Sequence, residues 1–383
     1  MEIINLLFIL IFFNYVFFIG LLIWGFSKVK TFSHPELVEG QKSGSENKTG
    51  FSIVIPFRNE EHNLPDLLQS LAQLKYSKEQ FEIIFVDDAS KDNSVRVINN
   101  WRMENPWIHL TILDNVRVSK SPKKDAITRA VMIAKHPWII TTDADCMVQP
   151  EWLSVYDTFI QNNDAEMIAG AVRFPTKGFL LSHFQQMDML SLQGASIGSF
   201  GLEEAFMCNG ANFAYTKTLF SDLKGFHGNN HIASGDDVFL LQKAIANFPE
   251  KVRYLKNQST IVTTKPEKSW FKLFKQRVRW ASKASAYQSD FAKGMAIVVF
   301  LANFMLLCGV FLLAFDLMQW QLLLVLFAVK FSVDFILMFQ ANRFLKMAMY
   351  SVVVSSLLYP VFSTLVALYS LIGGFEWKRE NIK

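Results

Sequence analysis

Charged residues are few in this chain. Asp, Glu, Lys and Arg make up only 19% of its 383 residues, and the formal net charge is +4. Such a small positive excess gives no basis for nucleic-acid binding. Cysteine is scarce too. Cys146, Cys208 and Cys308 show no CxxC spacing, which excludes a disulfide framework and a cysteine-based zinc site and is typical of a reducing compartment. HExxH and P-loop patterns are also missing.

Apolar residues dominate instead, at 51% of the chain with 36 Phe. Residues 4–25 form an uncharged run that can cross a bilayer, for which about 20 residues are needed. The run starts after "MEI" and is followed by Lys28 and Lys30, unlike a cleaved signal peptide, so we predict a retained anchor at 1–26. Positive residues after the anchor predict that the linker at 27–50, and the domain beyond it, are cytoplasmic.

The C-terminal part contains more membrane candidates. Three apolar runs lie at about 294–315, 318–339 and 348–373, within a region 294–374 that we expect to cross two or three times. Arg343 and Lys346 predict a cytoplasmic loop before the last run. Four full crossings would then place the basic tail, 375–383, outside, against the positive-inside rule. The alternative is that the last run, interrupted by Tyr359-Pro360, is a re-entrant hairpin.

Two charges, Lys330 and Asp334, interrupt the middle run. Charges at membrane depth are costly and normally face protein or water. Their spacing of four residues favours an ion pair within one helix, and a polar path through the membrane is the alternative interpretation.

The block between the membrane runs, 51–266, has the alternating strand and helix pattern of an α/β domain. The compact apolar runs "FSIVIPF", "FEIIFVDDAS", "HLTILDN" and "WIITTDADC" are typical of buried parallel strands. Helical leucine spacing in "EEHNLPDLLQSLAQL", and the segment "KKDAITRAVMIAK", separate them. Strands that alternate with helices predict a mostly parallel sheet with right-handed crossovers.

Two acidic clusters follow strands of this predicted sheet: Asp87-Asp88, and Asp143 with Asp145. Ligands bind beyond the carboxyl ends of such strands, and a single acidic pair there could equally be a solubilising feature. Two clusters on the same edge favour a site. Carboxylates two residues apart suit Mg²⁺ or Mn²⁺ that bridges to a diphosphate. Lys124 could reach the phosphates, although surface solvation also explains it.

The motifs "SIVIPFRNEEHNLPDLLQSL", "FEIIFVDDASKDNS", "KKDAI", "TTDADC", "CNGANFAY", "GDDVFLL" and "QRVRW", in this order over about 51–282, resemble glycosyltransferase family 2. The chain is similar to its membrane-embedded branch, which includes the cellulose, chitin-oligosaccharide, hyaluronan and poly-N-acetylglucosamine synthases. The resemblance implies a GT-A fold, a nucleotide-sugar donor (usually UDP-linked), a divalent metal and inversion at the anomeric carbon.

The resemblance also implies roles for individual residues. Asp88 would contact the uridine with Asp87 beside it, Asp145 would bind the metal and diphosphate, Asp143 would assist or contact the ribose, and Pro56, Arg58, Glu60 and Lys124 would line the donor site. Asp237 of "GDD" would be the general base, with Asp236 beside it. Gln276, Arg277, Arg279 and Trp280 of "QRVRW" (the QxxRW motif) would hold the diphosphate and the acceptor end.

The sequence departs from the family pattern in three places. Ala89 stands where a glycine is usual, "GDD" replaces "TED", and the missing glycine before "KKDAI" leaves Lys123 and Lys124 as alternatives. In "GDD", Asp236 beside Asp237 would raise one of their pKa values, which suits a base; a helix N-cap at Asp236 is an alternative that is compatible with it.

Residues 267–284, "EKSWFKLFKQRVRWASKA", mix aromatic and basic residues and predict an amphipathic helix on the cytoplasmic membrane surface. A solvent-exposed helix that caps the domain is the alternative.

Together these features predict an inverting, metal-dependent glycosyltransferase of the bacterial-type cytoplasmic (inner) membrane that contacts membrane lipid and a glycan or lipid-linked acceptor. A metal-dependent nucleotidyltransferase and a non-catalytic membrane scaffold are the competing functions. The sugar, the acceptor and the oligomeric state stay open. Polymer synthesis is favoured over single transfer only by a narrow margin, because four membrane runs are few for a self-contained export channel.

Overall fold

The computed structural model describes residues 2–33, 48–176, 178–232, 234–283, 286–372, 375–377 and 380–382. The chain divides into two compact units. We call them the sheet unit, Lys30–Arg173 with Met207–Lys265, and the helical unit, Met1–Val29 with Phe174–Phe206 and Pro266–Lys383.

The sheet unit is built on a seven-stranded sheet in the order β3-β2-β1-β4-β8-β6-β9. Its strands are β1 Phe51–Phe57, β2 Phe81–Asp87, β3 Leu110–Asp114, β4 Trp138–Thr141, β6 Met167–Gly170, β8 Phe213–Thr216 and β9 Val252–Leu255. Four neighbouring pairs are parallel, and only β8 runs antiparallel to its neighbours β4 and β6. A small second sheet, β5-β10-β7, is formed by β5 Cys146–Met147, β10 Val262–Thr264 and β7 Val172–Arg173.

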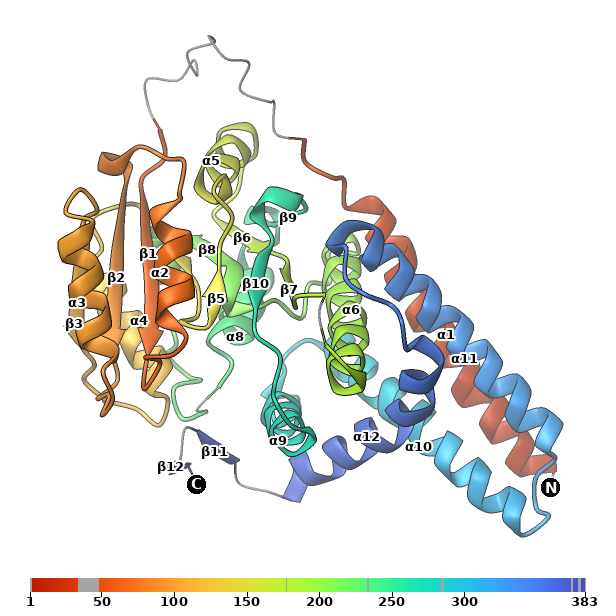
Figure 1. Cartoon of the computed structure of the whole chain (residues 1–383). Coiled ribbons are helices and arrows are strands. Elements are labelled where there is room, and N and C mark those ends of the chain that lie inside the picture. Colours follow the sequence, from red (N-terminus) through yellow and green to blue (C-terminus); the bar gives the residue numbers. More distant parts are fainter. Residues whose placement is uncertain are drawn as a thin grey trace. The chain divides into compact units, whose positions relative to one another are not determined.

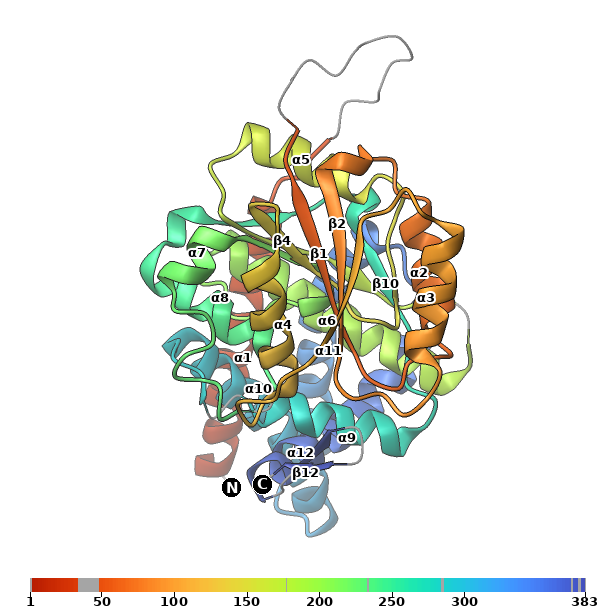
Figure 2. The same ribbon diagram turned by 90° about the vertical axis from the view of Figure 1, so that its left-hand side faces the viewer.

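Helices cover both faces of the parallel strands (Figures 1 and 2). The helices of this unit are α2 Leu64–Ala72, α3 Ser94–Glu104, α4 Pro122–Ile133, α5 Trp152–Asn162, α7 Lys217–Asp222 and α8 Asp236–Asn247, with short 3-10 turns η1 Lys78–Gln80, η2 Gly210–Asn212, η3 Pro249–Lys251 and η4 Gln258–Thr260. Figure 2 shows α4 on one side of β1 and β2, with α2 and α3 on the other. Burial on both faces explains why the strands are continuous apolar runs.

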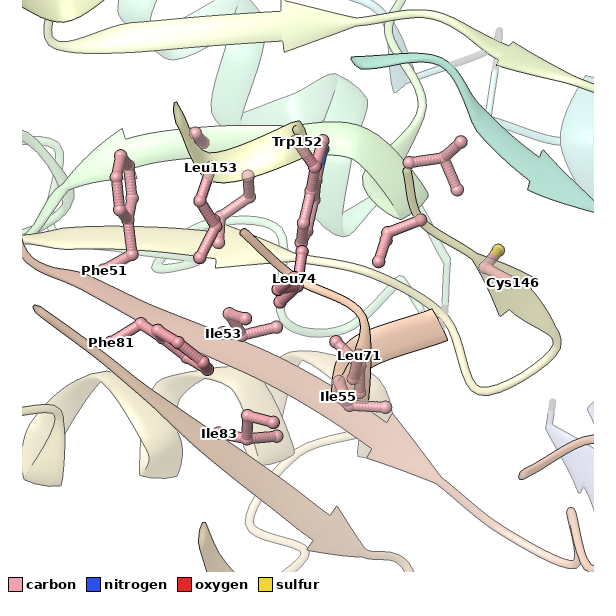
Figure 3. Packing of buried hydrophobic residues seen from close by; sticks show 14 of the residues in the cluster. Phe51, Ile53, Ile55, Leu71, Leu74, Phe81, Ile83, Cys146, Trp152 and Leu153 are labelled. Atoms are coloured by element: carbon pink, nitrogen blue, oxygen red, sulfur yellow. The ribbon is translucent and has the colours of Figure 1, made fainter. Parts of the chain in front are cut away.

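The core of the sheet unit packs β1 between its neighbours and the helices. Phe51, Ile53 and Ile55 of β1 are fully buried, and Figure 3 shows them beside the β2 side chains and against Trp152 and Leu153 at the start of α5. In the parallel register Val54 of β1 lies opposite Ile84 and Thr141. Phe57 and Asp87, the last residues of β1 and β2, lie opposite each other, whereas β4 ends earlier, opposite Val54. Because the three strands are parallel, the residues that follow them lie along one edge of the sheet.

The helical unit contains the expected membrane helices. Its elements are α1 Glu2–Lys28, α6 Leu180–Gly201, α9 Trp270–Ala281, α10 Asp290–Ala314, α11 Trp320–Leu345, α12 Val352–Ile372 and a two-stranded hairpin, β11 Phe375–Trp377 and β12 Glu380–Ile382. The helices α1, α10, α11 and α12 are long and apolar enough to cross a membrane. Because α12 runs unbroken through Pro360, it is one helix and not a hairpin. The tail residues Lys378 and Arg379 lie outside the described residues.

The helix α6 was not predicted, and it moves residues 174–206 out of the expected 51–266 block and into the helical unit. Its glycines explain the difference, because they allow α6 to pack backbone to backbone against α1. A Cβ on Gly25 would lie 2.1 Å from the Gly198 carbonyl oxygen, and one on Gly201 would lie 1.8 Å from the Gly25 carbonyl oxygen. Close approach through small residues is typical of helix pairs in membranes.

The charges in α11 are paired, as the simpler interpretation predicted. Lys330 Nζ donates to Asp334 Oδ2 at 2.7 Å, and Asp334 Oδ1 accepts from the Tyr15 hydroxyl of α1 at 2.6 Å. The Lys330 side chain is 7% exposed and lies over the Tyr15 ring. The pair thus joins α11 to α1, and both charged groups bind side chains of the helical unit.

Candidate active site

The acidic residues predicted for the donor and the base gather at one edge of the sheet unit. Asp143 and Asp145 follow β4, and Asp236 and Asp237 begin α8. Gly235 adopts a left-handed conformation, with φ of +85°, where the chain turns into α8. A glycine is favoured there because side chains disfavour that conformation.

Lys123, at the start of α4, lies between the two acidic elements. Its Nζ is 2.8 Å from Asp143 Oδ1 and 3.2 Å from Asp236 Oδ2. Burial alone would lower the pKa of Lys123, but the nearby carboxylates, Asp143 first and then Asp236, raise it above its usual value. Lys123 is therefore a fixed cation that joins Asp143, after β4, to Asp236 at the start of α8.

Asp145 lies in an environment that disfavours its own negative charge. Burial, followed by the charges of Asp143 and Glu60, raises the pKa of Asp145 from 3.8 to about 6. One ligand atom each from Asp143, Asp145 and Cys146 lie within 4.8 Å of one another. Asp143 is paired with Lys123, but its charge still raises the pKa of Asp145. Two carboxylates at this spacing fit a divalent cation, because a cation would offset the repulsion between them.

Asp237 is held by the backbone of η2. The Gly210 N–H donates to Asp237 Oδ2 at 3.0 Å, and the Thr141 hydroxyl donates to the Gly210 carbonyl at 2.6 Å. Both contacts come from the end of β4 or the turn beside it. The geometry fixes Asp237 at the helix start, where the N-terminal dipole favours a carboxylate.

Asp88 is buried and surrounded by donors. Arg117 binds it through two contacts, Nε to Oδ1 at 2.8 Å and Nη2 to Oδ2 at 2.7 Å. Asn115 Nδ2 donates to Oδ1 at 2.8 Å, and Arg58 Nη1 lies 3.4 Å from Oδ2. Asp87 accepts from the Ser90 N–H at 3.0 Å. The predicted uridine contact of Asp88 would thus share its carboxylate with Arg117.

Of the remaining predicted donor residues, Pro56 lies in β1 opposite Val86, and Glu60 accepts from the Asn63 side chain at 2.7 Å. Lys124 lies elsewhere. Its side chain is buried and its Nζ donates to the carbonyls of Asn229 and Ile232. The prediction that Lys124 holds the phosphates is therefore not what the structure shows, because α4 turns Lys123, and not Lys124, toward the acids.

The QxxRW segment lies in the helix α9, Trp270–Ala281, inside the stretch that was predicted to be helical. Arg277 Nε donates to Asp188 Oδ2 of α6 at 2.6 Å, and both side chains are nearly inaccessible. The Arg277 guanidinium also lies 4.1 Å from the Trp280 ring centre, and Gln276 donates to Glu267 at 3.1 Å. Arg277 is thus an internal partner of Asp188, which differs from its predicted contact with diphosphate or acceptor.

Sequence reasoning missed Arg117 and Asn115, and it named Lys123 only as an alternative to Lys124. Arg117 and Asn115 lie in the loop after β3, which carries no acidic cluster. The strand order would have indicated them. Because β3 lies next to β2 in the sheet, the loop after β3 lies beside the loop after β2, which carries Asp88.

The pattern "GASIG", residues 194–198, matches the GxSxG pattern of hydrolases by chance. It lies inside α6, not at a strand-to-helix turn, and Gly198 packs on α1. A nucleophile elbow needs that turn to expose its serine.

Residues 52–224 match the model of glycosyl transferase family 2. A poly-beta-1,6-N-acetyl-D-glucosamine synthase of Staphylococcus epidermidis is 25% identical over 278 residues, which are 72% of this chain and 64% of the relative. A poly(ribitol-phosphate) beta-glucosyltransferase of Bacillus spizizenii is 30% identical over 125 residues, 32% of this chain and 19% of that one. The alignments thus span less than two thirds of these relatives.

The fold also matches a solved structure. A mannosyltransferase from Pyrobaculum calidifontis, in complex with GDP-Man and Mn²⁺, aligns over 99% of both chains with a TM-score of 0.61 at 16% identity. This likeness confirms the GT-A fold with a mostly parallel sheet, and it extends over the apolar helices. The chain carries a glycosyl transferase family 2 domain over residues 52–224.

Proposed function

We propose that this chain is a membrane-bound glycosyltransferase that moves a sugar from a nucleotide-sugar donor to a glycan or lipid-linked acceptor. The observation that supports it best is the convergence of Asp143, Lys123 and Asp236 at the sheet edge, with Asp145 and Asp237 beside them. Acids on two elements, joined by a lysine, provide groups for both the leaving diphosphate and the attacking hydroxyl.

The metal site of the proposal is formed by Asp143 and Asp145, which would hold Mg²⁺ or Mn²⁺. A bound divalent cation would neutralise charge on the donor diphosphate. Lys123, whose pKa is raised by the surrounding acids, stays protonated and can add a second positive charge on the same side. Asp145 must lose its proton to bind a cation, so its raised pKa makes metal affinity increase as the pH rises through about 6.

The transfer itself is a single displacement. The acceptor oxygen forms a bond to the anomeric carbon, the bond from that carbon to the diphosphate oxygen breaks, and the nucleoside diphosphate leaves with the electron pair. Asp237 takes the hydroxyl proton. Asp236 is paired with Lys123, and Asp237 accepts from the backbone N–H groups of Gly210 and Val238, which hold its carboxylate at the start of α8. One displacement inverts the anomeric carbon.

The donor in this proposal is UDP-linked, and UDP-N-acetylglucosamine is the first sugar to try because the matched staphylococcal relative is a poly-N-acetylglucosamine synthase. The archaeal structure contains GDP-Man, so GDP-mannose is the natural competitor in the experiment. Membranes that contain the chain should be given UDP-N-acetylglucosamine, UDP-glucose or GDP-mannose with Mn²⁺, and released nucleoside diphosphate measured. The Asp145→Asn variant is the control. Turnover with a UDP-sugar that is lost in the variant supports the proposal. Turnover of GDP-mannose alone would overturn the UDP assignment, and equal turnover in the variant would overturn the site.

The catalytic domain in this proposal faces the cytoplasm of a bacterial-type cell, where nucleotide sugars are made. Lys28 ends α1 and Lys30 follows it, as the positive-inside rule requires for a cytoplasmic domain. A reporter enzyme that is active only outside the membrane should stay silent when fused after residue 45. An active reporter would reverse the orientation.

A further inference from the structure

Lys124 is a buried lysine whose ammonium binds backbone carbonyls. Its side chain is among the fully buried ones of the chain. The Nζ donates to the carbonyl oxygens of Asn229 at 2.7 Å and Ile232 at 3.0 Å, and it lies 5.0 Å from the Phe239 ring centre. A buried ammonium is costly unless it is hydrogen-bonded, so the structure strongly favours keeping both carbonyls where they are.

The two carbonyls belong to the segment that leads into α8. The Ile232 N–H donates to the Asn229 carbonyl at 3.1 Å, so this carbonyl accepts both from the turn and from the Lys124 ammonium. At the other end of the segment, Lys243 of α8 donates to the carbonyls of Gly225 and His227, each at 2.7 Å. Lysines from two helices therefore hold the main chain of residues 223–232.

The contact continues into α8 itself. Ile232 precedes Asp236 by four residues, and Phe239, one turn into α8, faces the same ammonium. The neighbouring Lys123 meanwhile binds the Asp236 side chain. Two successive residues of α4 thus hold the start of α8, Lys123 through a carboxylate and Lys124 through the backbone.

We propose that Lys124 is a positioning residue that fixes segment 223–232 and, through it, the placement of Asp237 at the start of α8. The inference rests on the proposed function for its kinetic consequence. It assigns Lys124 to the base and the acceptor side of the reaction, and not to the phosphates of the donor.

The test compares Lys124→Met with Lys124→Arg and with Lys243→Met as the matched control. Methionine fills the space but cannot hold the carbonyls, so kcat should fall by about 10²-fold, the scale on which misplaced catalytic groups act. UDP affinity, measured by calorimetry with Mn²⁺, should not change. Arginine can still donate to both carbonyls and should recover most of kcat. The Lys243→Met variant loosens the far end of the segment and should lower kcat less.

A double substitution separates positioning from general stability. If Lys124 acts through the base, Lys124→Met should lower kcat little further in the Asp237→Asn background. Additive losses, or a loss of UDP affinity that matches the loss of kcat, would overturn the inference. Hydrogen exchange of peptide 223–232 gives a readout independent of turnover. It should speed up in Lys124→Met and not in Lys124→Arg, and unchanged exchange in Lys124→Met would also overturn the inference, even if no donor is turned over.

Discussion

Gly25 and Gly20 lie on the same helix, α1, but in opposite surroundings, so replacing each by alanine tests the packing of α1 on α6. An alanine Cβ at Gly25 would lie 2.1 Å from the Gly198 carbonyl oxygen and 2.8 Å from the Leu202 side chain. At Gly20, among the described residues, no atom other than the neighbouring backbone of α1 itself lies within 4 Å of the added Cβ. Gly20→Ala is therefore a control that shares the gain in helix propensity with Gly25→Ala but lacks the steric clash with α6.

The magnitude follows from the geometry. Ordinary contact begins at 3.4 Å, so the Gly25→Ala methyl would sit about 1.3 Å too close to a backbone atom, and the two helices must move apart. Overpacking usually costs about 1–3 kcal/mol, and backbone yields less easily than side chains. Alanine also gains up to about 1 kcal/mol of helix propensity over glycine, but this gain applies to both variants and cancels in their difference.

Thermal unfolding of the purified protein in detergent provides the assay. We expect Gly20→Ala to unfold at the wild-type temperature or slightly above it, and Gly25→Ala to unfold several degrees lower, since roughly 2–4 °C corresponds to 1 kcal/mol in mid-sized domains. If both variants unfold together, α1 and α6 do not meet through these backbones, and the packing argument for α6 is refuted.

Three further predictions concern charged residues. The pKa of Asp145 is raised on folding, so the stability it contributes is present below pH 3.8 and is lost as the pH rises through about 6. In EDTA at pH 7.5, Asp145→Asn should therefore be more stable than wild type, by up to about 3 kcal/mol in the free energy of unfolding, and should unfold at a higher temperature. Near pH 4 the unfolding temperatures of the two proteins should converge. A variant that is less stable than wild type at pH 7.5 contradicts this. Asp237→Asn should lower turnover by about 10²-fold or more and leave UDP affinity unchanged, whereas Asp236→Asn should be milder, and a reversed order in kinetic assays would identify Asp236 as the base. Arg277→Met leaves Asp188 buried without its cation, which costs about 3–5 kcal/mol, and the double variant with Asp188→Leu should recover much of the loss in thermal unfolding; no recovery would show that the pair is not coupled.

The sheet was predictable because its strands are buried on both faces and appear as short, β-branched runs. The run around Val54 in β1 is only 7 residues long and rich in β-branched residues, which favours a buried strand over a helix. The four apolar helices were predictable for a similar reason, since length and lack of charge suffice.

Helix α6 was not predictable from its own sequence. It contains Gln185, Gln186, Asp188 and Gln193 among its buried residues, so neither hydropathy nor amphipathic periodicity identifies its partners. The polar groups are satisfied by distant residues. Gln186, for example, accepts from the Ala348 N–H at 2.9 Å, across 162 residues of sequence.

The acidic clusters of the site were predictable from the sequence. Which of two adjacent residues, such as Lys123 and Lys124, faces these clusters was not. Adjacent residues on a helix point about 100° apart, and only the start of α4 at Pro122 decides that Lys123 faces Asp143 while Lys124 turns to the loop. The buried pairing of Arg277 with Asp188 depends in the same way on α6, whose position the sequence did not reveal.

The central claim is that the chain breaks the bond between a sugar and its nucleoside diphosphate. Phosphorus NMR of a reaction that contains a UDP-sugar, Mn²⁺ and membranes with the chain identifies the phosphorus products directly. The account predicts that UDP accumulates in proportion to the sugar transferred, with no pyrophosphate, and that UDP formation stops in Asp145→Asn. Pyrophosphate as the product would identify a nucleotidyltransferase, and an unchanged spectrum with every nucleotide sugar would contradict the proposed enzyme.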